Sequence, residues 1–119
     1  MQVTTPLADS LGRFLNLTSD EMKVTASNMA NIDTPGYKTQ GFDFSQAFQS
    51  ELHSSGDHKT RGVRTGPVDG LVARPDGHNV SMDRESLQLA KSQLEFRTGV
   101  ELLKREYARV MSAIHAEGR

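Results

Sequence analysis

The sequence predicts a mainly α-helical protein in which long N-terminal and C-terminal helices pair as a coiled coil. Apolar residues recur at helical spacing over the first quarter of the 119-residue chain and at heptad spacing over its last third. Between them, a stretch rich in Gly, Ser and Pro shows neither helical nor strand periodicity. We therefore expect an N-terminal part, 1–53, a flexible or irregular middle segment, 54–79, and a C-terminal helix, 80–119, with the two ends forming one helical domain.

The N-terminal helix is expected to begin at Thr5, a good N-cap, followed by Pro6, which suits the first helical position. The sequence Thr18-Ser19-Asp20-Glu21 resembles a capping box, but the apolar face continues in phase across it, so we expect one helix, bent or loosened there. That face comprises Leu7, Leu11, Phe14, Leu15, Thr18, Met22, Ala26 and Met29, of which Leu11, Leu15, Met22 and Met29 are predicted assembly-interface residues.

The helix exit is the most specified stretch of the chain. Asn31 can end the helix because a short amide tolerates the left-handed conformation, and Thr34 precedes a proline and is pushed towards extended geometry. Pro35 and Gly36 then fit the two central positions of a type II turn. The motif and turn residues to which we assign a functional role are Asn28, Asn31, Asp33, Thr34, Pro35, Gly36 and Tyr37. In the packed tube that the family resemblance given below implies, we expect the polar side chains of Ser27, Asn28 and Asn31 to bond to neighbouring backbones at the subunit boundary.

A second, short helix is expected after the turn. Asp43 is its N-cap, and Gln46 three residues later completes a capping box. Phe44, Ala47, Phe48 and Leu52 share one face, and Phe44 and Phe48 are predicted to need a partner surface because so short a helix is marginal alone. In the middle segment, 68–73 is the candidate for a short strand.

The C-terminal helix carries the clearest pattern. Ser81 is its expected N-cap, with Asp83 near the positive end of the helix dipole. The predicted seam consists of Met82, Leu89, Phe96, Val100, Leu103, Tyr107, Val110 and Ile114, interrupted by Ser86 and Gln93. All of these except Met82 are predicted assembly-interface residues. Leu87, Ala90 and Leu94 form a second stripe roughly opposite, which predicts a neighbour from another chain.

No pattern in the sequence indicates catalysis. The chain has no cysteine, and its four histidines show no HExxH or other zinc-ligand spacing, so we expect no enzyme activity, no cofactor and no metal. A formal net charge of −1 does not favour nucleic acid as a partner. We also expect no membrane span and see no cleaved signal peptide, because no apolar run is long enough.

Several motifs resemble one known family. The stretch 26–38, Ala-Ser-Asn-Met-Ala-Asn-Ile-Asp-Thr-Pro-Gly-Tyr-Lys, is similar to the N-terminal signature of the bacterial flagellar rod and hook proteins, the axial family of the flagellum. The segments 41–44 and 76–85, and the run from Leu89 to Leu103, look most like a B-type proximal rod protein of that family. The chain departs from the pattern at Met29, Ser81 and Phe96, where size or capping ability is kept.

The resemblance implies a structural subunit of the periplasm-spanning flagellar rod, which transmits torque and encloses the export channel. It implies export by the flagellar type III machinery without a cleaved signal peptide, and terminal helices that stack into a helical tube. The implied partners are further copies of the chain, other rod subunits, the adaptor between the rod base and the export gate or MS ring, and the export machinery. The alternatives are a C-type rod protein of the same family and a soluble helical-hairpin adaptor.

Overall fold

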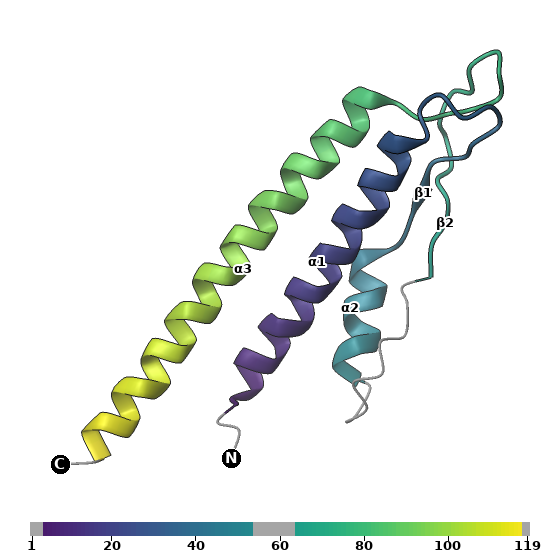
Figure 1. The fold of residues 1–119 in the computed structure, drawn as a ribbon. Helices are drawn as coiled ribbons and strands as arrows, with labels where there is room; N and C mark the ends of the chain where they lie inside the picture. Colours follow the sequence, from purple (N-terminus) through teal and green to yellow (C-terminus); the bar gives the residue numbers. More distant parts are fainter. Residues whose placement is uncertain (1–3, 54–63, 118–119) are drawn as a thin grey trace.

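The computed structural model describes residues 4–53 and 64–117 and shows an elongated helical hairpin, 70 × 27 × 20 Å, with a small loop region at one end. Residues 54–63, which open the predicted middle segment, lie outside the described part of the chain. Figure 1 shows the two long helices side by side and antiparallel, with the short helix on the far side of the N-terminal one.

Helix α1 (Pro6–Ala30) begins and continues as the sequence predicts. The Thr5 hydroxyl accepts a hydrogen bond from the Ala8 amide at 3.1 Å, and Pro6 occupies the first turn. The helix is unbroken across the capping-box sequence at 18–21, because the apolar face runs in phase through it and the Thr18 hydroxyl turns back to the Phe14 carbonyl at 2.9 Å.

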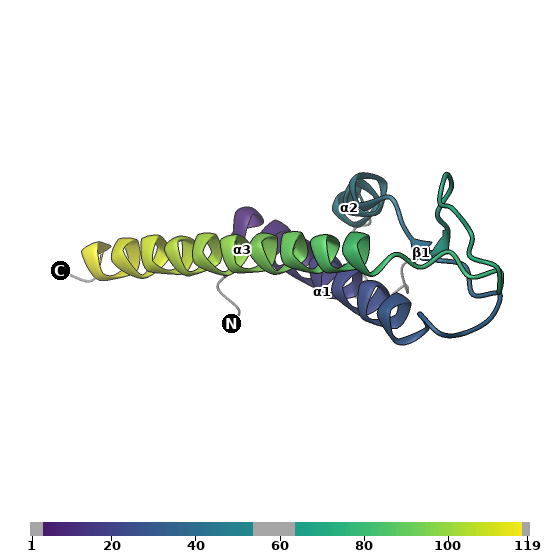
Figure 2. The same cartoon turned by 90° about the horizontal axis from the view of Figure 1, so that it is seen from above.

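Helix α3 (Met82–Glu117) has 36 residues, which corresponds to a length of about 54 Å at 1.5 Å per residue. Ser81 caps it, accepting from the Arg84 amide at 3.4 Å. Figure 2 shows α3 running on well past the level at which α1 begins, so its C-terminal turns have no α1 turn beside them.

Helix α2 (Phe44–His53) packs on α1 through aromatic rings. The Phe14 ring meets those of Phe44 and Phe48 edge-on, with centroid separations of 5.5 and 6.1 Å. Asp43 caps α2 by accepting from the Gln46 amide at 3.1 Å, as predicted. The partner surface that the two phenylalanines require is therefore α1 of the same chain.

The two short strands are β1 (Gln40–Gly41) and β2 (Gly66–Pro67), which pair antiparallel with Gln40 opposite Pro67. The predicted strand at 68–73 is wrong, since pairing ends at Pro67 and only the Val68 amide adds a bond, to the Thr39 carbonyl at 2.9 Å. Asp69-Gly70 follows as a turn in which Gly70 adopts a φ of 80°, and this turn takes the chain away from β1.

The helix exit combines a confirmed turn with a different cap. Gly36 has a φ of 74°, and the Tyr37 amide donates to the Thr34 carbonyl at 3.2 Å, as a type II turn requires. Asn31 does end the helix, but at φ −103° and not in the left-handed conformation. The side-chain amide of Asn31 instead donates to the Ser27 carbonyl at 2.8 Å, so the end of α1 is capped without a positive φ.

The interior of the hairpin is unusually polar. Among the described residues the buried apolar side chains are Ala8, Leu17 and Val80. The buried polar residues outnumber them and are Thr18, Thr25, Asn28, Thr39, His78, Glu85, Ser92 and Glu106. Because such groups need partners to be tolerated, the hydrogen bonds between the elements specify how they fit together.

Candidate functional site

The face that α3 turns towards α1 contains a heptad row that we call the polar seam: Glu85, Ser92, Gly99 and Glu106. These four are the buried residues of α3, and each lies seven positions after the last. The flanking apolar residues Leu89, Phe96, Leu103 and Val110 are half-buried. The packed stripe therefore alternates between a polar or small residue and an apolar one.

Three members of the polar seam bond to α1 or its cap in one antiparallel register. The Asn28 amide donates to the Glu85 carboxylate at 3.1 Å, and the Ser92 hydroxyl donates to the Glu21 carboxylate. At the far end the Thr5 hydroxyl donates to Glu106 at 2.8 Å. A shift of one turn would bury these groups without partners, so the row fixes how the helices align.

Gly99 is the point of close approach between the helices. A Cβ atom on Gly99 would lie 2.8 Å from the Leu15 Cδ2 atom and 3.2 Å from the Phe14 ring. Phe14 is itself held between the rings of Phe44 and Phe48. A glycine here lets α3, α1 and α2 pack without displacing these side chains.

The open end of the hairpin has an ion pair within α3. The Arg109 guanidinium donates to both oxygens of Glu106, at 2.8 and 3.1 Å. These hydrogen bonds, with a further one from Thr5, hold the pKa of Glu106 below its usual value. Glu106 therefore stays ionised while it bonds the N-cap of α1 to α3.

Asn28 joins the hairpin to the loop region. It is 1% exposed, and its side chain makes four hydrogen bonds. Its amide nitrogen donates to the Gln40 carbonyl at 2.8 Å and to Glu85. Its carbonyl oxygen accepts from the Tyr37 hydroxyl at 3.0 Å and the Gln40 amide at 2.9 Å. One amide thus connects α1, the turn, β1 and α3.

Below this junction, the chain after the turn lies against the chain that enters α3. The Thr39 amide and hydroxyl bond to the Asn79 side chain and carbonyl at 2.6 and 3.1 Å. The Gly36 amide donates to the Asp76 carbonyl at 3.0 Å, and Lys38 donates to the Gly77 carbonyl at 2.8 Å. The part of the middle segment from 64 onward is therefore irregular but tied to the helix exit.

The structure places the predicted motif residues in two groups. Asn28 and Tyr37 point inward, whereas Asp33, Thr34, Pro35 and Gly36 are exposed. That Ser27, Asn28 and Asn31 bond to neighbouring subunits stays a prediction. Within the single chain, the Asn28 side chain makes four hydrogen bonds, and the Asn31 side chain bonds to Ser27 and Thr34.

The predicted interface residues also fall into two groups, half-buried and exposed. Most are half-buried within the hairpin, namely Leu11, Leu15, Met22, Met29, Phe44, Phe48, Leu89, Phe96, Val100, Leu103 and Val110. Tyr107 and Ile114 lie beyond the start of α1 and are 48% and 46% exposed. Tyr107 and Ile114 are exposed in the single chain, and the assignment of all of these residues to an assembly interface stays a prediction.

The polar seam itself was absent from the sequence-based predictions. A search for apolar heptads passes over Glu85, Ser92, Gly99 and Glu106, because three are polar and the fourth has no side chain. Their signal is the seven-residue spacing itself, offset by four from Leu89, Phe96 and Leu103.

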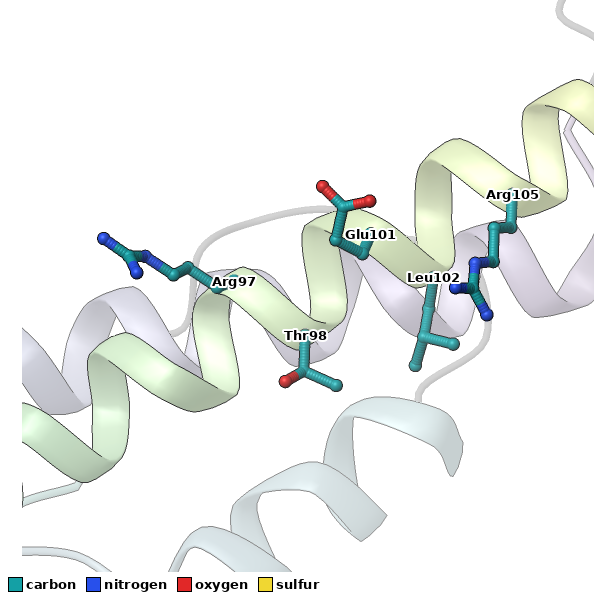
Figure 3. A pocket seen from close by; sticks show the side chains of 5 residues that line it. All are labelled: Arg97, Thr98, Glu101, Leu102 and Arg105. Atoms are coloured by element: carbon teal, nitrogen blue, oxygen red, sulfur yellow. The ribbon is translucent and has the colours of Figure 1, made fainter.

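The described residues hold no group of three or more His, Asp or Glu placed for a metal ion, and none of their helices is long and apolar enough to cross a membrane. A surface hollow of about 260 Å³ is lined by residues of α3 alone, namely Arg97, Thr98, Glu101, Leu102 and Arg105. Figure 3 shows these five side chains.

Comparison with known proteins agrees with this picture. A family model described as "Flagella basal body rod protein" matches residues 14–38, which span α1 from Phe14, the turn and Tyr37. The chain is 29% identical to the flagellar basal body rod protein FlgB of Salmonella typhimurium, over 84% of this chain and 86% of that protein. It is 27% identical to the Escherichia coli K12 FlgB, over 86% and 88%.

A third relative is matched almost end to end. The flagellar basal body rod protein FlgB of Cereibacter sphaeroides is 30% identical, and the alignment covers 95% of this chain and 99% of that protein. It therefore includes both long helices and the loop region that Asn28 connects to them. The chain belongs to the FlgB family of flagellar basal body rod proteins.

Proposed function

We propose that this protein is a structural subunit of the rod of the bacterial flagellar basal body and that it assembles with other components of that rod. The observation that carries this function is the near end-to-end match to a FlgB protein, in a chain whose described residues form a long helical hairpin. The protein is not an enzyme.

Within that function we propose the proximal part of a periplasm-spanning axial tube that transmits torque and encloses the export channel. The partners would be further copies of this chain, other rod subunits, and the adaptor at the rod base. Delivery would use the flagellar type III export machinery without a cleaved signal peptide. The exposed Tyr107 and Ile114 support an assembly role for α3, because they continue its apolar stripe beyond Glu106, which bonds to the N-cap of α1.

A gene deletion tests the function. Cells lacking the chain should be non-motile and should lack complete rods, and expression of the wild-type chain should restore both. Basal bodies should be purified from the complemented strain, with a tag on the chain, and probed for that tag. Complete rods in the deletion strain, or a tag found only in a small soluble complex, would contradict the rod assignment and favour a helical-hairpin adaptor.

A further inference from the structure

The segment that leads from β2 to α3 (Figure 1) contains two Asp-Gly dipeptides, Asp69-Gly70 and Asp76-Gly77. Both lie in turns, and both glycines have a positive φ, 80° at Gly70 and 90° at Gly77. The two dipeptides differ in their hydrogen bonds. We propose that Asp69 is a modification site, at which the chain converts spontaneously to isoaspartate with water as the only other reactant, and that the fold protects Asp76 from the same reaction.

The reaction requires the amide nitrogen of the following residue to reach the aspartate side chain. The nitrogen attacks Cγ of the protonated carboxyl, a C–N bond forms, and the carboxyl hydroxyl leaves as water with the amide proton, which gives a cyclic imide. Water then opens the imide at the former main-chain carbonyl. The chain afterwards runs through Cβ, with a free α-carboxylate and no net change in composition. Glycine favours the attack because no Cβ atom crowds its nitrogen.

The Asp69-Gly70 peptide breaks no hydrogen bond when it reacts. Both residues are exposed, and neither the Asp69 carboxylate nor the Gly70 amide makes a hydrogen bond or an ion pair with another of the described residues. The neighbouring bond, from the Val68 amide to the Thr39 carbonyl at 2.9 Å, lies before the dipeptide and leaves it free. The Asp69 carboxyl can therefore turn over the amide of the next residue.

The Asp76-Gly77 peptide is bonded at each group that the reaction must move. The Gly77 amide donates to the Arg74 carbonyl at 2.8 Å, and the Asp76 carbonyl accepts from the Gly36 amide at 3.0 Å. The Asp76 carboxylate accepts from the His78 amide at 3.2 Å, and its other oxygen lies 3.5 Å from Nε2 of the His78 ring. His78 is only 3% exposed, so this partner is held in place.

Hydrogen bonding separates the two sites more than exposure does, because the Asp76 side chain is itself 42% exposed. Cyclisation at Asp76 would break the bonds that Gly77, Gly36 and His78 donate. Each such bond is worth at least about a factor of two, so losing all three in the transition state slows the reaction by about tenfold or more. In the unfolded chain these bonds are absent, and the two aspartates should react at similar rates.

One tryptic peptide reports on both positions. Trypsin cleaves after Arg64 and Arg84 but not after Arg74, which precedes a proline, so the peptide 65–84 contains both dipeptides. The full chain is incubated at neutral pH, either folded in buffer or unfolded in urea, and the peptide is analysed by mass spectrometry with electron-transfer fragmentation, which distinguishes isoaspartate from aspartate. In the folded chain, isoaspartate should form at position 69 at least about tenfold faster than at position 76, and in urea at similar rates.

The variant Asp69→Glu is the matched control, because it keeps the charge of an exposed side chain while glutamate must close a larger, slower-forming ring. It should lose the signal at position 69, and circular dichroism checks that it remains folded. Similar rates at the two positions in the folded chain, no isoaspartate at position 69 when the unfolded chain forms it, or a signal that persists in the variant would overturn the proposal. None of these outcomes depends on the rod assignment, which the gene deletion tests separately.

Discussion

Substituting alanine for each of two helical glycines gives the sharpest test of how α1 and α3 pack. Gly12 in α1 has no atom within 4 Å of an added Cβ, whereas a Cβ at Gly99 would meet Leu15 at 2.8 Å and Phe14 at 3.2 Å. In both variants the alanine gains about 1 kcal/mol of helix propensity. At Gly99 the added methyl also overpacks the seam, at a cost of about 1–3 kcal/mol.

The two variants should therefore differ by about 1–3 kcal/mol in free energy of unfolding, with Gly12→Ala more stable than wild type and Gly99→Ala equal to it or less stable. The Leu15 end can rotate aside, but the Phe14 ring is held by Phe44 and Phe48, which limits relaxation. Urea titration followed by circular dichroism measures the difference. If the Gly99→Ala variant is as much more stable than wild type as the Gly12→Ala variant, the close approach of the helices at Gly99 is refuted.

Asn28→Ala tests the junction, Glu106→Gln the open end and Leu103→Asp the apolar contact between the long helices, and Asn31→Ala is a control for the first. Asn28→Ala strips partners from four groups and should lower the free energy of unfolding by about 3–5 kcal/mol in urea titration, whereas Asn31→Ala, whose side chain lies near the surface, should cost under about 1 kcal/mol. The pKa of Glu106 is lowered in the folded chain, so the ionised carboxylate stabilises the fold. This stabilisation is fully present above the usual pKa of 4.5 and is lost as the pH falls through the lowered pKa of the folded chain. Acid titration of Glu106→Gln should show a smaller loss of stability over that range than wild type, and an identical loss would argue against the ion pair. Leu103→Asp puts an unpaired charge into the seam and should abolish motility in a complementation assay, so full motility would count against the seam as an assembly element.

The elements were predictable because their signals are local. Thr5 and Ser81 begin the long helices, Asp43 begins the short one, and Pro35-Gly36 makes the expected turn, since caps and turns depend on a few neighbouring residues. Pairing of the two long helices followed from their apolar spacing.

The contacts that the sequence did not predict are those between residues far apart in the chain. In the sequence alone, Glu85 and Glu106 look like ordinary solvent-exposed charges. Their hydrogen-bond partners, Asn28 and Thr5, lie 57 and 101 residues away in the chain. The short strand was misplaced because two residues of pairing leave no periodicity to detect. The contacts of Asn28 within the chain were likewise not predictable, because nothing local shows that the Tyr37 hydroxyl and the Gln40 backbone reach it.

A reconstruction of the basal body rod by electron cryo-microscopy, from cells that carry this chain, tests the central claim most directly. The account predicts density for the α1–α3 hairpin in the rod wall, with Gly99 at the helix contact and the C-terminal turns of α3 against a neighbouring subunit. A complete rod in which every subunit is accounted for by other proteins would contradict it.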